Sequence, residues 1–224
     1  MRPHQGHRRK PGERARITLV DIVDAARCVY ERTGVAGLSM RTVADELGVA
    51  PNALYSHVRS RDDMVDKLID SILGAVAAPT DDRDWQEALF SLMKSSRAVL
   101  LEHGDLMPFF MSRATRGTNA LRLGEETLGH LARGGVTGEE AVTALRVLLV
   151  YTIGFAAYEY PRRTDDAPED RTRRSVQSFR DAPAGPHMRS LAESVAAHPD
   201  SEDFERGLHW IIQGIASRTL DRRG

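Results

Sequence analysis

The chain has 224 residues, of which 41 % are hydrophobic and 28 % charged, the composition of an ordinary soluble globular protein. The uncharged run from Val147 to Tyr158 is too short to cross a bilayer, and the basic N-terminus has no apolar stretch behind it that would make a secretory signal. A single cysteine, Cys28, excludes a disulfide framework and a zinc site built on cysteine pairs. We therefore expect a cytoplasmic protein without membrane association, metal or cofactor.

The net charge of −1 conceals two oppositely charged parts. Residues 1–61 contain 11 Lys and Arg against 6 Asp and Glu, whereas residues 62–224 contain 20 against 26. A small basic part on a larger acidic body is typical of a protein that binds a polyanion through one end. Chance clustering in a chain with 28 arginines is the alternative explanation.

The first periodic segment predicts a helix over residues 17–33. Thr18 and Thr33 are the candidate boundary residues, Gly34 is suited to end the helix, and Cys28 lies within the pattern as an expected small buried residue. The apolar positions that recur at helical spacing are Leu19, Ile22, Val23, Ala26, Val29 and Tyr30.

The next segment has the pattern of a helix-turn-helix. A short helix is expected to be capped by Ser39 and to end near Leu47, with Gly48 in the left-handed turn position. Pro51 then fits the first turn of a second short helix, where its missing N–H has no helical partner to lose. The apolar contacts between the two helices are assigned to Val43, Leu47, Val49, Leu54 and Val58, with small Ala44 at the crossing.

The second helix of such a unit enters the major groove of DNA. Asn52, Ala53 and Ser56 would then face outward, and all three are small or polar, so the backbone can approach base edges closely. Tyr55 and His57 add hydrogen-bonding groups. A packing corner of any helical protein is the alternative, but the basic N-terminal part favours DNA. A periodic helix over residues 61–78 follows and would connect this part to the body.

These residues resemble the N-terminal domain of the tetracycline-repressor family of bacterial transcription regulators. The resemblance covers roughly residues 17–64, and residues 204–215 resemble the final helix of the subgroup that includes the tetracycline repressor. The matching N-terminal signature consists of Leu38–Ala44, Leu47–Val49, Leu54–Val58 and Arg61–Met64.

The resemblance implies an all-α fold. It has a three-helix helix-turn-helix DNA-binding domain over residues 17–64, a connecting helix continuing to residue 78, and a larger ligand-binding and dimerisation domain over residues 79–224. It also implies a homodimer that binds a palindromic double-stranded DNA operator and releases it when a small molecule occupies the C-terminal domain. On the same ground we expect a repressor of a drug-efflux gene, with an activator of the same fold as the alternative.

Carried over to this sequence, the resemblance assigns the DNA contacts residue by residue. Arg41, followed by Thr42, corresponds to a base-contacting position of the first motif helix, and Arg61 stands where relatives place a phosphate-binding lysine. Base-reading and backbone-contacting positions are Pro51, Asn52, Ala53, Tyr55, Ser56 and His57.

The first 16 residues form a predicted flexible basic arm. Its cations are expected to enter a neighbouring minor groove or to lie along phosphates, and a tail that only improves solubility is the alternative. The arm's candidate DNA-binding residues are Arg8, Arg9, Lys10, Arg14 and Arg16.

The body is predicted to be helical, with a boundary at the polar residues 81–84. Glu139–Tyr160 is apolar on all sides, so we expect it to pair with Glu202–Leu220 in a four-helix interface between two subunits. The charged residues 161–186 lack periodicity and are expected to form a mobile loop. The remaining predicted elements are a helix from Trp85 to about His103, a short apolar piece at 105–113, and helices over 117–133 and 187–197.

Aromatic and methionine side chains cluster around the short apolar piece. They favour a pocket for a bulky hydrophobic or aromatic effector, such as a polyketide-like antibiotic or a drug, although ordinary core packing is the alternative for each. Residues 109–115 show no histidine matching the tetracycline–magnesium site, so no metal is expected here. The candidate lining residues are Met93, His103, Met107, Phe110, Met111, Tyr151, Phe155 and Tyr158.

Two other classes of function remain to be weighed. The sequence contains no GxGxxG, P-loop, GxSxG or HExxH motif, and its eight histidines show no recurrent metal spacing, so an enzyme is disfavoured. A helical protein-binding adaptor, in which the motif helices only pack, is the remaining alternative.

Overall fold

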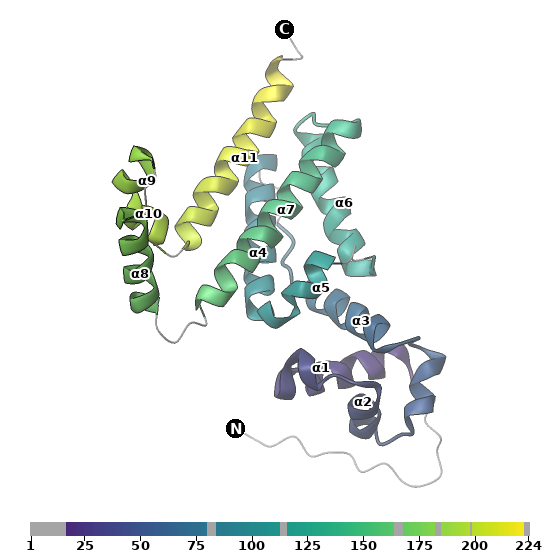
Figure 1. The fold of residues 1–224 in the computed structure, drawn as a ribbon. Coiled ribbons are helices and arrows are strands. Elements are labelled where there is room, and N and C mark those ends of the chain that lie inside the picture. The colour runs from purple at the N-terminus through teal and green to yellow at the C-terminus, as the bar shows by residue number, and fades with distance from the viewer. Residues whose placement is uncertain are drawn as a thin grey trace, which may run out of the picture. The chain divides into compact units, whose positions relative to one another are not determined.

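A computed structural model describes residues 17–79, 84–112, 116–163, 168–181, 185–197 and 199–221, and every regular element in these ranges is a helix (Figure 1). The predicted all-α fold is thus confirmed. The chain divides into two compact units, Met1–Leu68 and Ile69–Gly224. The predicted basic arm lies outside the described residues.

The first helix of the N-terminal unit, α1, runs from Leu19 to Gly37. Thr18 and Asp21 form a reciprocal capping box at its start, and Gly34, with φ 65° and ψ −176°, ends the regular helix as predicted, before a last turn to Gly37. Cys28 is exposed, which contradicts its predicted burial. The buried face consists of Ile22, Ala25, Ala26, Val29 and Tyr30, and position 28 is turned about 200° from position 26, away from that face.

The helix-turn-helix consists of α2, Met40–Leu47, and the 3₁₀ helix η1, Pro51–Ser56. Ser39 caps α2 as predicted, and Gly48 adopts the left-handed conformation with φ 67° and ψ 35°. The predicted second short helix is present, and it is a 3₁₀ helix. In the structure, N–H groups at both of its ends donate three residues back, Ala53 to Ala50 and His57 to Leu54, so the turn is tighter.

Helix α3, Arg61–Leu73, is shorter than the predicted helix to residue 78. Gly74 follows Leu73, and the N–H groups of Gly74, Ala75 and Val76 each donate to a carbonyl three residues earlier, so the α-helical pattern ends there. Arg122 contacts the carbonyl oxygens of Leu73 and Val76, at 3.5 and 3.3 Å, and thereby partners acceptors at the helix end. Residues 61–68 of α3 belong to the first unit and the rest to the second.

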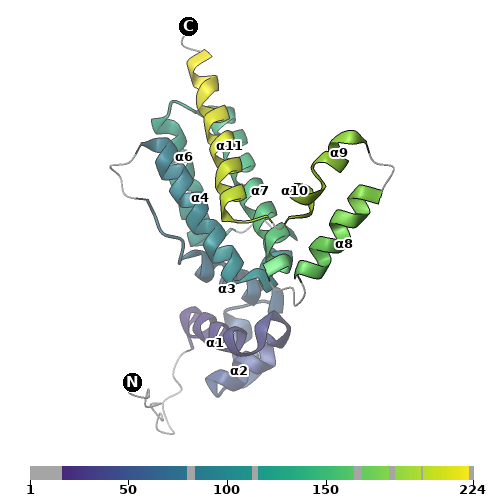
Figure 2. The same ribbon diagram turned by 90° about the vertical axis from the view of Figure 1, so that its left-hand side faces the viewer.

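The second unit is a bundle around α4, Trp85–Glu102, which packs against α6, α7 and α11 (Figures 1 and 2). Asp84 caps α4 by accepting a hydrogen bond from the N–H of Gln86. The short apolar piece is helical, as η2, Gly104–Leu106, and α5, Met107–Ser112. The other bundle helices are α6, Thr118–Arg133; α7, Gly138–Arg163; and α11, Ser201–Asp221.

The mobile loop predicted over residues 161–186 is wrong for the residues of that segment that the structure describes, because they are helical apart from the end at residue 185. This segment contains α8, Pro168–Asp181, and the predicted single helix after it is divided into α9, Pro186–Ser190, and α10, Ala192–Ala196. The three helices pack against one another, with Ala192 buried (Figure 2). Val176 and Phe179 are half-buried among exposed charges, a narrow apolar strip that a search for long periodic runs overlooks.

Helix α7 contains a long apolar stretch. By length and composition alone, Gly138–Pro161 is sufficient to cross a membrane, although its uncharged run is shorter than a bilayer requires. A central helix of a bundle meets the same criterion, and α7 packs against α4, α5, α6 and α11. Only 28 % of the most apolar stretch of α7 is buried within this chain. Much of its apolar surface is therefore open to another partner. Exposed large side chains on α7 are Val142, Val147, Leu149, Val150 and Tyr158.

Candidate nucleic-acid interface and ligand cavity

The helix-turn-helix presents a largely polar outer surface because most of its apolar side chains lie inside, although Leu47 and Val49 are only half-buried. Val43, Ala44, Leu54 and Val58 are completely buried. Ala53 is half-buried. The other candidate DNA-binding residues of the two motif helices are exposed: Arg41, Thr42, Pro51, Asn52, Tyr55, Ser56 and His57.

Some of the exposed polar side chains of this surface form hydrogen bonds within the protein, and others extend away from it. The Thr42 hydroxyl donates to the carbonyl of Gly37 at 2.9 Å, and the Ser56 hydroxyl donates to that of Ala53 at 2.8 Å. Arg41, by contrast, has a side chain 86 % exposed and lies 3.9 Å from Asp45. Thr42 and Ser56 therefore help to fix the motif, whereas Arg41 extends into solvent.

Arg61 holds the end of α1. Its Nε donates to the carbonyl of Leu38 and its Nη2 to that of Val35, both at 2.7 Å. Nη1 lies 4.0 Å from Asp62. The phosphate-binding role assigned to Arg61 stays a prediction, and it would have to be performed by Nη1 or by breaking these bonds.

A cavity of about 300 Å³ lies within the second unit, and its wall is almost entirely apolar. Helices α4, α5, α6 and α7 contribute to it, together with Leu73 from the end of α3. The lining residues are Leu73, Leu92, Met93, Ser96, Leu100, Phe110, Ala120, Leu123, Gly124, Thr127, Leu149, Thr152 and Ile153.

Of the eight residues predicted to line a ligand site, Met93 and Phe110 line this cavity. Met107 is buried, and His103 ends α4 half-buried. Met111 and Tyr158 are 65 % and 51 % exposed, which places them at the surface of the isolated chain.

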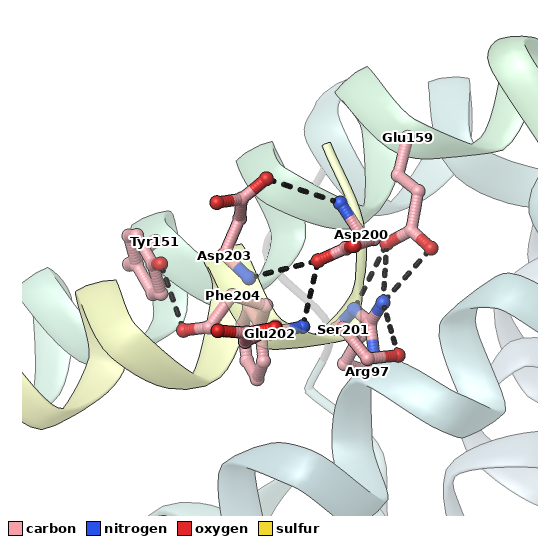
Figure 3. Close-up of polar contacts among 8 residues, drawn as sticks. All are labelled: Arg97, Tyr151, Glu159, Asp200, Ser201, Glu202, Asp203 and Phe204. Carbon is pink, nitrogen blue, oxygen red and sulfur yellow. Dashed lines mark hydrogen bonds and ion pairs between the residues drawn. The ribbon is translucent and has the colours of Figure 1, made fainter. Parts of the chain in front are cut away.

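Tyr151 and Phe155 pack in a different cluster, around Phe204 of α11. The Tyr151 ring stacks on Phe204 with centroids 5.3 Å apart, and its hydroxyl donates to the Phe204 carbonyl at 2.9 Å (Figure 3). Burial raises the pKa of the Tyr151 hydroxyl above its ordinary value. Phe155 meets Phe204 edge to face, also at 5.3 Å.

A buried ion pair fastens three helices beside these rings. Arg97 of α4 donates through Nε and Nη2 to both carboxylate oxygens of Glu159 on α7, at 2.6 to 2.9 Å. Nη2 also donates to the Ser201 hydroxyl at the start of α11, at 3.2 Å (Figure 3). The guanidinium lies 4.9 Å from the centre of the Phe204 ring. This pairing compensates two charges that would be costly to bury alone.

A carboxylate of α3 caps α6. Asp70 accepts hydrogen bonds from the N–H groups of Asn119 and Ala120, both at 3.0 Å, and the Asn119 amide donates to the Asp70 carbonyl at 2.9 Å. Asp70 thereby partners N–H groups that the first turn of a helix leaves unbonded. The end of α3 and the start of α6 are consequently held together.

Most of the cavity wall was not identified from the sequence. One face of α6 carries mostly small side chains at helical spacing: Ala120, Leu123, Gly124 and Thr127. Small side chains leave space beside the helix. That pattern was available as a signal. The Asp70 cap and the Arg97–Glu159 pair were not, since their partners lie 49 and 62 positions apart.

A helix-turn-helix with an exposed polar reading surface, followed by a helical unit with an apolar cavity, defines a one-component transcription regulator. The sequence profile described as "Bacterial regulatory proteins, tetR family" matches residues 22–68, and that described as "Tetracyclin repressor-like, C-terminal domain" matches residues 78–219. The chain therefore belongs to the TetR family of helix-turn-helix transcriptional repressors, whose members bind DNA operators as dimers and respond to small molecules.

Individual relatives agree along nearly the whole chain. The HTH-type transcriptional repressor DrrR1 of Streptomyces coeruleorubidus is 30 % identical, covering 98 % of this chain and 84 % of the relative. The class A tetracycline repressor of Escherichia coli is 29 % identical, covering 89 % and 90 %. The structure of apo ActR from Streptomyces coelicolor superimposes with a TM-score of 0.83 at 28 % identity, covering 94 % of this chain and 100 % of ActR. ActR is also known in complex with actinorhodin, again with a TM-score of 0.83 to this chain.

Proposed function

We propose that this protein is a ligand-responsive repressor that binds a palindromic operator as a homodimer and releases it when a bulky hydrophobic or aromatic molecule fills the α4–α7 cavity. The observation that carries the proposal is the wall of that cavity. It includes Leu73, the last residue of the helix whose first half belongs to the DNA-binding unit. In this proposal the gene controlled is that of a drug-efflux transporter, and the protein acts in the cytoplasm.

The dimer is proposed to form through α7 and α11. Val147, Val150 and Tyr158 of α7 are exposed and do not line the cavity. Together with Trp210 of α11, which is 67 % exposed, they would be covered by the same helices of a second copy. Two helices from each copy make a four-helix interface with two-fold symmetry. Such a dimer presents two helix-turn-helix units, as a palindromic operator requires.

Release is proposed to pass from α6 to α3. Ala120, Leu123, Gly124 and Thr127 of α6 face the cavity, and the start of α6 is bonded to Asp70. A ligand that fits only a shifted α6 would move the end of α3 with it. By binding the non-operator arrangement more tightly, it would lower DNA affinity in proportion to its preference for that state.

The effector class is supported by the cavity and by the relatives. An apolar cavity of about 300 Å³ is at the small end of ligand sites and suits a rigid, largely apolar molecule. ActR, similar in fold and 28 % identical, has been crystallised with actinorhodin. The relatives' names favour repression over activation, because DrrR1 is a repressor.

The experiment begins with selection of bound sequences from a random DNA pool, followed by a mobility-shift assay on the selected operator. Actinorhodin and a panel of aromatic drugs are then tested for release. Failure to bind any selected DNA would favour the adaptor alternative, and release by none of the compounds would remove the effector part of the proposal.

Two glycines of α6 provide a matched pair of variants. A Cβ at either Gly124 or Gly129 meets no atom within 4 Å, but only Gly124 lines the cavity. Gly124→Leu should raise the effector concentration needed for release roughly tenfold or more, equivalent to about 1.4 kcal/mol. Gly129→Leu makes the same change in helix propensity and should leave release unchanged. Equal behaviour of the two variants would contradict the assignment of the cavity.

A further inference from the structure

Three hydroxyl groups are the polar side-chain groups among the described residues that line the cavity. They come from three different helices: Ser96 of α4, Thr127 of α6 and Thr152 of α7. Charged and titratable side chains do not occur among these lining residues. The hydrogen-bonding character of the wall therefore depends on how these three hydroxyls are already engaged.

Each of the three hydroxyls donates to a carbonyl of its own helix, four residues back. The distances are 2.8 Å from Ser96 to Leu92, 2.7 Å from Thr127 to Leu123 and 2.8 Å from Thr152 to Leu148. Thr152 is also 3.3 Å from the sulfur of Met93. A hydroxyl has one proton to donate and two lone pairs that can accept. With the proton committed, each group offers the cavity an acceptor.

This arrangement favours ligands that donate hydrogen bonds over ligands that accept them. A ligand O–H that meets one of these oxygens adds a hydrogen bond and breaks none. A ligand carbonyl or carboxylate gains a bond only if the protein hydroxyl turns away from its helix, so one bond replaces another. A carboxylate also loses its hydration in a wall that supplies no cation, which is the more costly event.

We propose that the cavity selects uncharged hydroxyarenes, that is, fused aromatic rings whose phenolic groups remain protonated and donate to Ser96, Thr127 or Thr152. This inference rests on the proposed function, because it assigns the chemistry of the same effector site. Ser96 is half-buried, whereas Thr127 and Thr152 are 1 % and 2 % exposed, so Ser96 is the acceptor most accessible to a ligand.

The test measures direct binding of four compounds of one shape to the full chain by calorimetry or fluorescence: anthracene, 2-hydroxyanthracene, 9,10-anthraquinone and anthracene-2-carboxylate. We expect 2-hydroxyanthracene to bind about tenfold more tightly than anthracene, since a net hydrogen bond that also leaves no group unpaired has roughly this effect. Anthraquinone should bind no more tightly than anthracene, and the carboxylate more weakly than both.

Three conservative variants identify the acceptors: Ser96→Ala, Thr127→Val and Thr152→Val. Each removes a hydroxyl whose carbonyl partner lies within an α-helix, so none should leave a buried group without a partner. Ser96→Ala should reduce the preference for 2-hydroxyanthracene over anthracene the most, because it removes the most accessible of the three acceptors. An equal loss for both compounds would indicate a packing effect and contradict the role as acceptor.

The outcomes separate this inference from the proposed function. If the quinone or the carboxylate binds as tightly as the hydroxyarene, the selection for donors is wrong while the cavity remains the effector site. If none of the four binds and Gly124→Leu also leaves operator release unchanged, both are wrong. Weak binding of anthracene and tight binding of 2-hydroxyanthracene would support both the effector site and its selection for donors, provided that Ser96→Ala abolishes the tight binding.

Discussion

The two units of this repressor are specified in different ways. In the N-terminal unit, the starts of α1 and α2 are capped by residues three positions apart, Thr18 with Asp21 and Ser39 with Thr42, and the turn is set by the φ of Gly48. The long-range bonds of Arg61 to the end of α1 are an exception. In the ligand-binding unit, the stabilising contacts join distant segments, such as Arg97 with Glu159 and Asp70 with Asn119. Short-range rules therefore predict the DNA-reading part, whereas the cavity depends on packing between helices.

The largest effect is expected from breaking the buried ion pair. Glu159→Ala leaves the Arg97 guanidinium without its carboxylate in a side chain that is only 9 % exposed. Removal of one partner of such a pair costs about 3–5 kcal/mol, whereas replacing both by methionine should cost less. Denaturant unfolding of the full-length protein measures the difference. Lys94→Ala, which breaks an exposed pair with Glu205, is the control and should cost about 1 kcal/mol or less.

Gly104, next to the ring of Tyr160, gives a steric test of whether the ligand-binding unit depends on packing between distant segments. A Cβ at Gly104 would lie 2.0 Å from the Tyr160 ring, so the ring or the backbone must move. Gly104→Ala should destabilise the protein by about 1–3 kcal/mol, the usual range for overpacking. Combining it with Tyr160→Leu should recover part of that loss in thermal unfolding. Additive losses in the double variant would show that the ring is not the obstacle.

The Asp70 cap tests whether the ligand-binding unit also transmits a signal. Asp70→Ala removes the acceptor for two N–H groups of α6 and should cost about 1 kcal/mol of stability, as losing a helix cap does. Its distinguishing effect is on coupling: effector binding should persist while effector-induced operator release weakens. Asp84→Ala, which removes the cap of α4, has a similar local effect and serves as the control. Unimpaired release in Asp70→Ala would show that the contact between Asp70 and α6 does not transmit the effector signal.

In the DNA-binding unit the matching glycine test is purely local. Gly48 has φ +67°, and a Cβ there would meet no atom within 4 Å. Gly48→Ala should therefore cost about 1 kcal/mol from backbone strain alone, and Gly48→Asn should cost less because asparagine tolerates this conformation. No second-site change should rescue it, in contrast to Gly104→Ala. Thermal unfolding of the single and combined variants measures both.

The sequence predicted the elements that obey local rules and missed those that depend on neighbours. Ser39, Gly48 and Pro51 were assigned correctly because capping, φ and a missing N–H are properties of a few adjacent residues. Cys28 was misplaced because its helix was given a wider apolar face than the one that packs. α8 was missed because its half-buried strip, Val176 and Phe179, is too short to give a periodic signal against many charges.

The candidate cavity shows the same limit. Aromatic and sulfur-containing side chains were expected to surround the ligand, yet Tyr151 and Phe155 pack on Phe204 instead. The wall is made largely of aliphatic and small residues, which carry no chemical signal individually. The helical spacing of Gly124 and Thr127 with Ala120 and Leu123 marks one face of α6, but only the packing of α4, α6 and α7 around a common space makes that face a cavity wall.

The smallest expected effect comes from Arg32 and Glu46, which link α1 to α2 across 14 positions and are both exposed. The hydrogen bond from Arg32 lowers the pKa of Glu46 below its ordinary value. A lowered carboxyl pKa contributes stability above the unfolded-state value, and that contribution is lost as pH falls through the folded-state value. Wild type should therefore exceed Glu46→Gln slightly in melting temperature near neutral pH. The difference should vanish in acid and shrink in high salt, because exposed pairs are screened. A difference that persists in acid would mean that Glu46 acts through packing, and would make the DNA-binding unit less local than its caps and turns indicate.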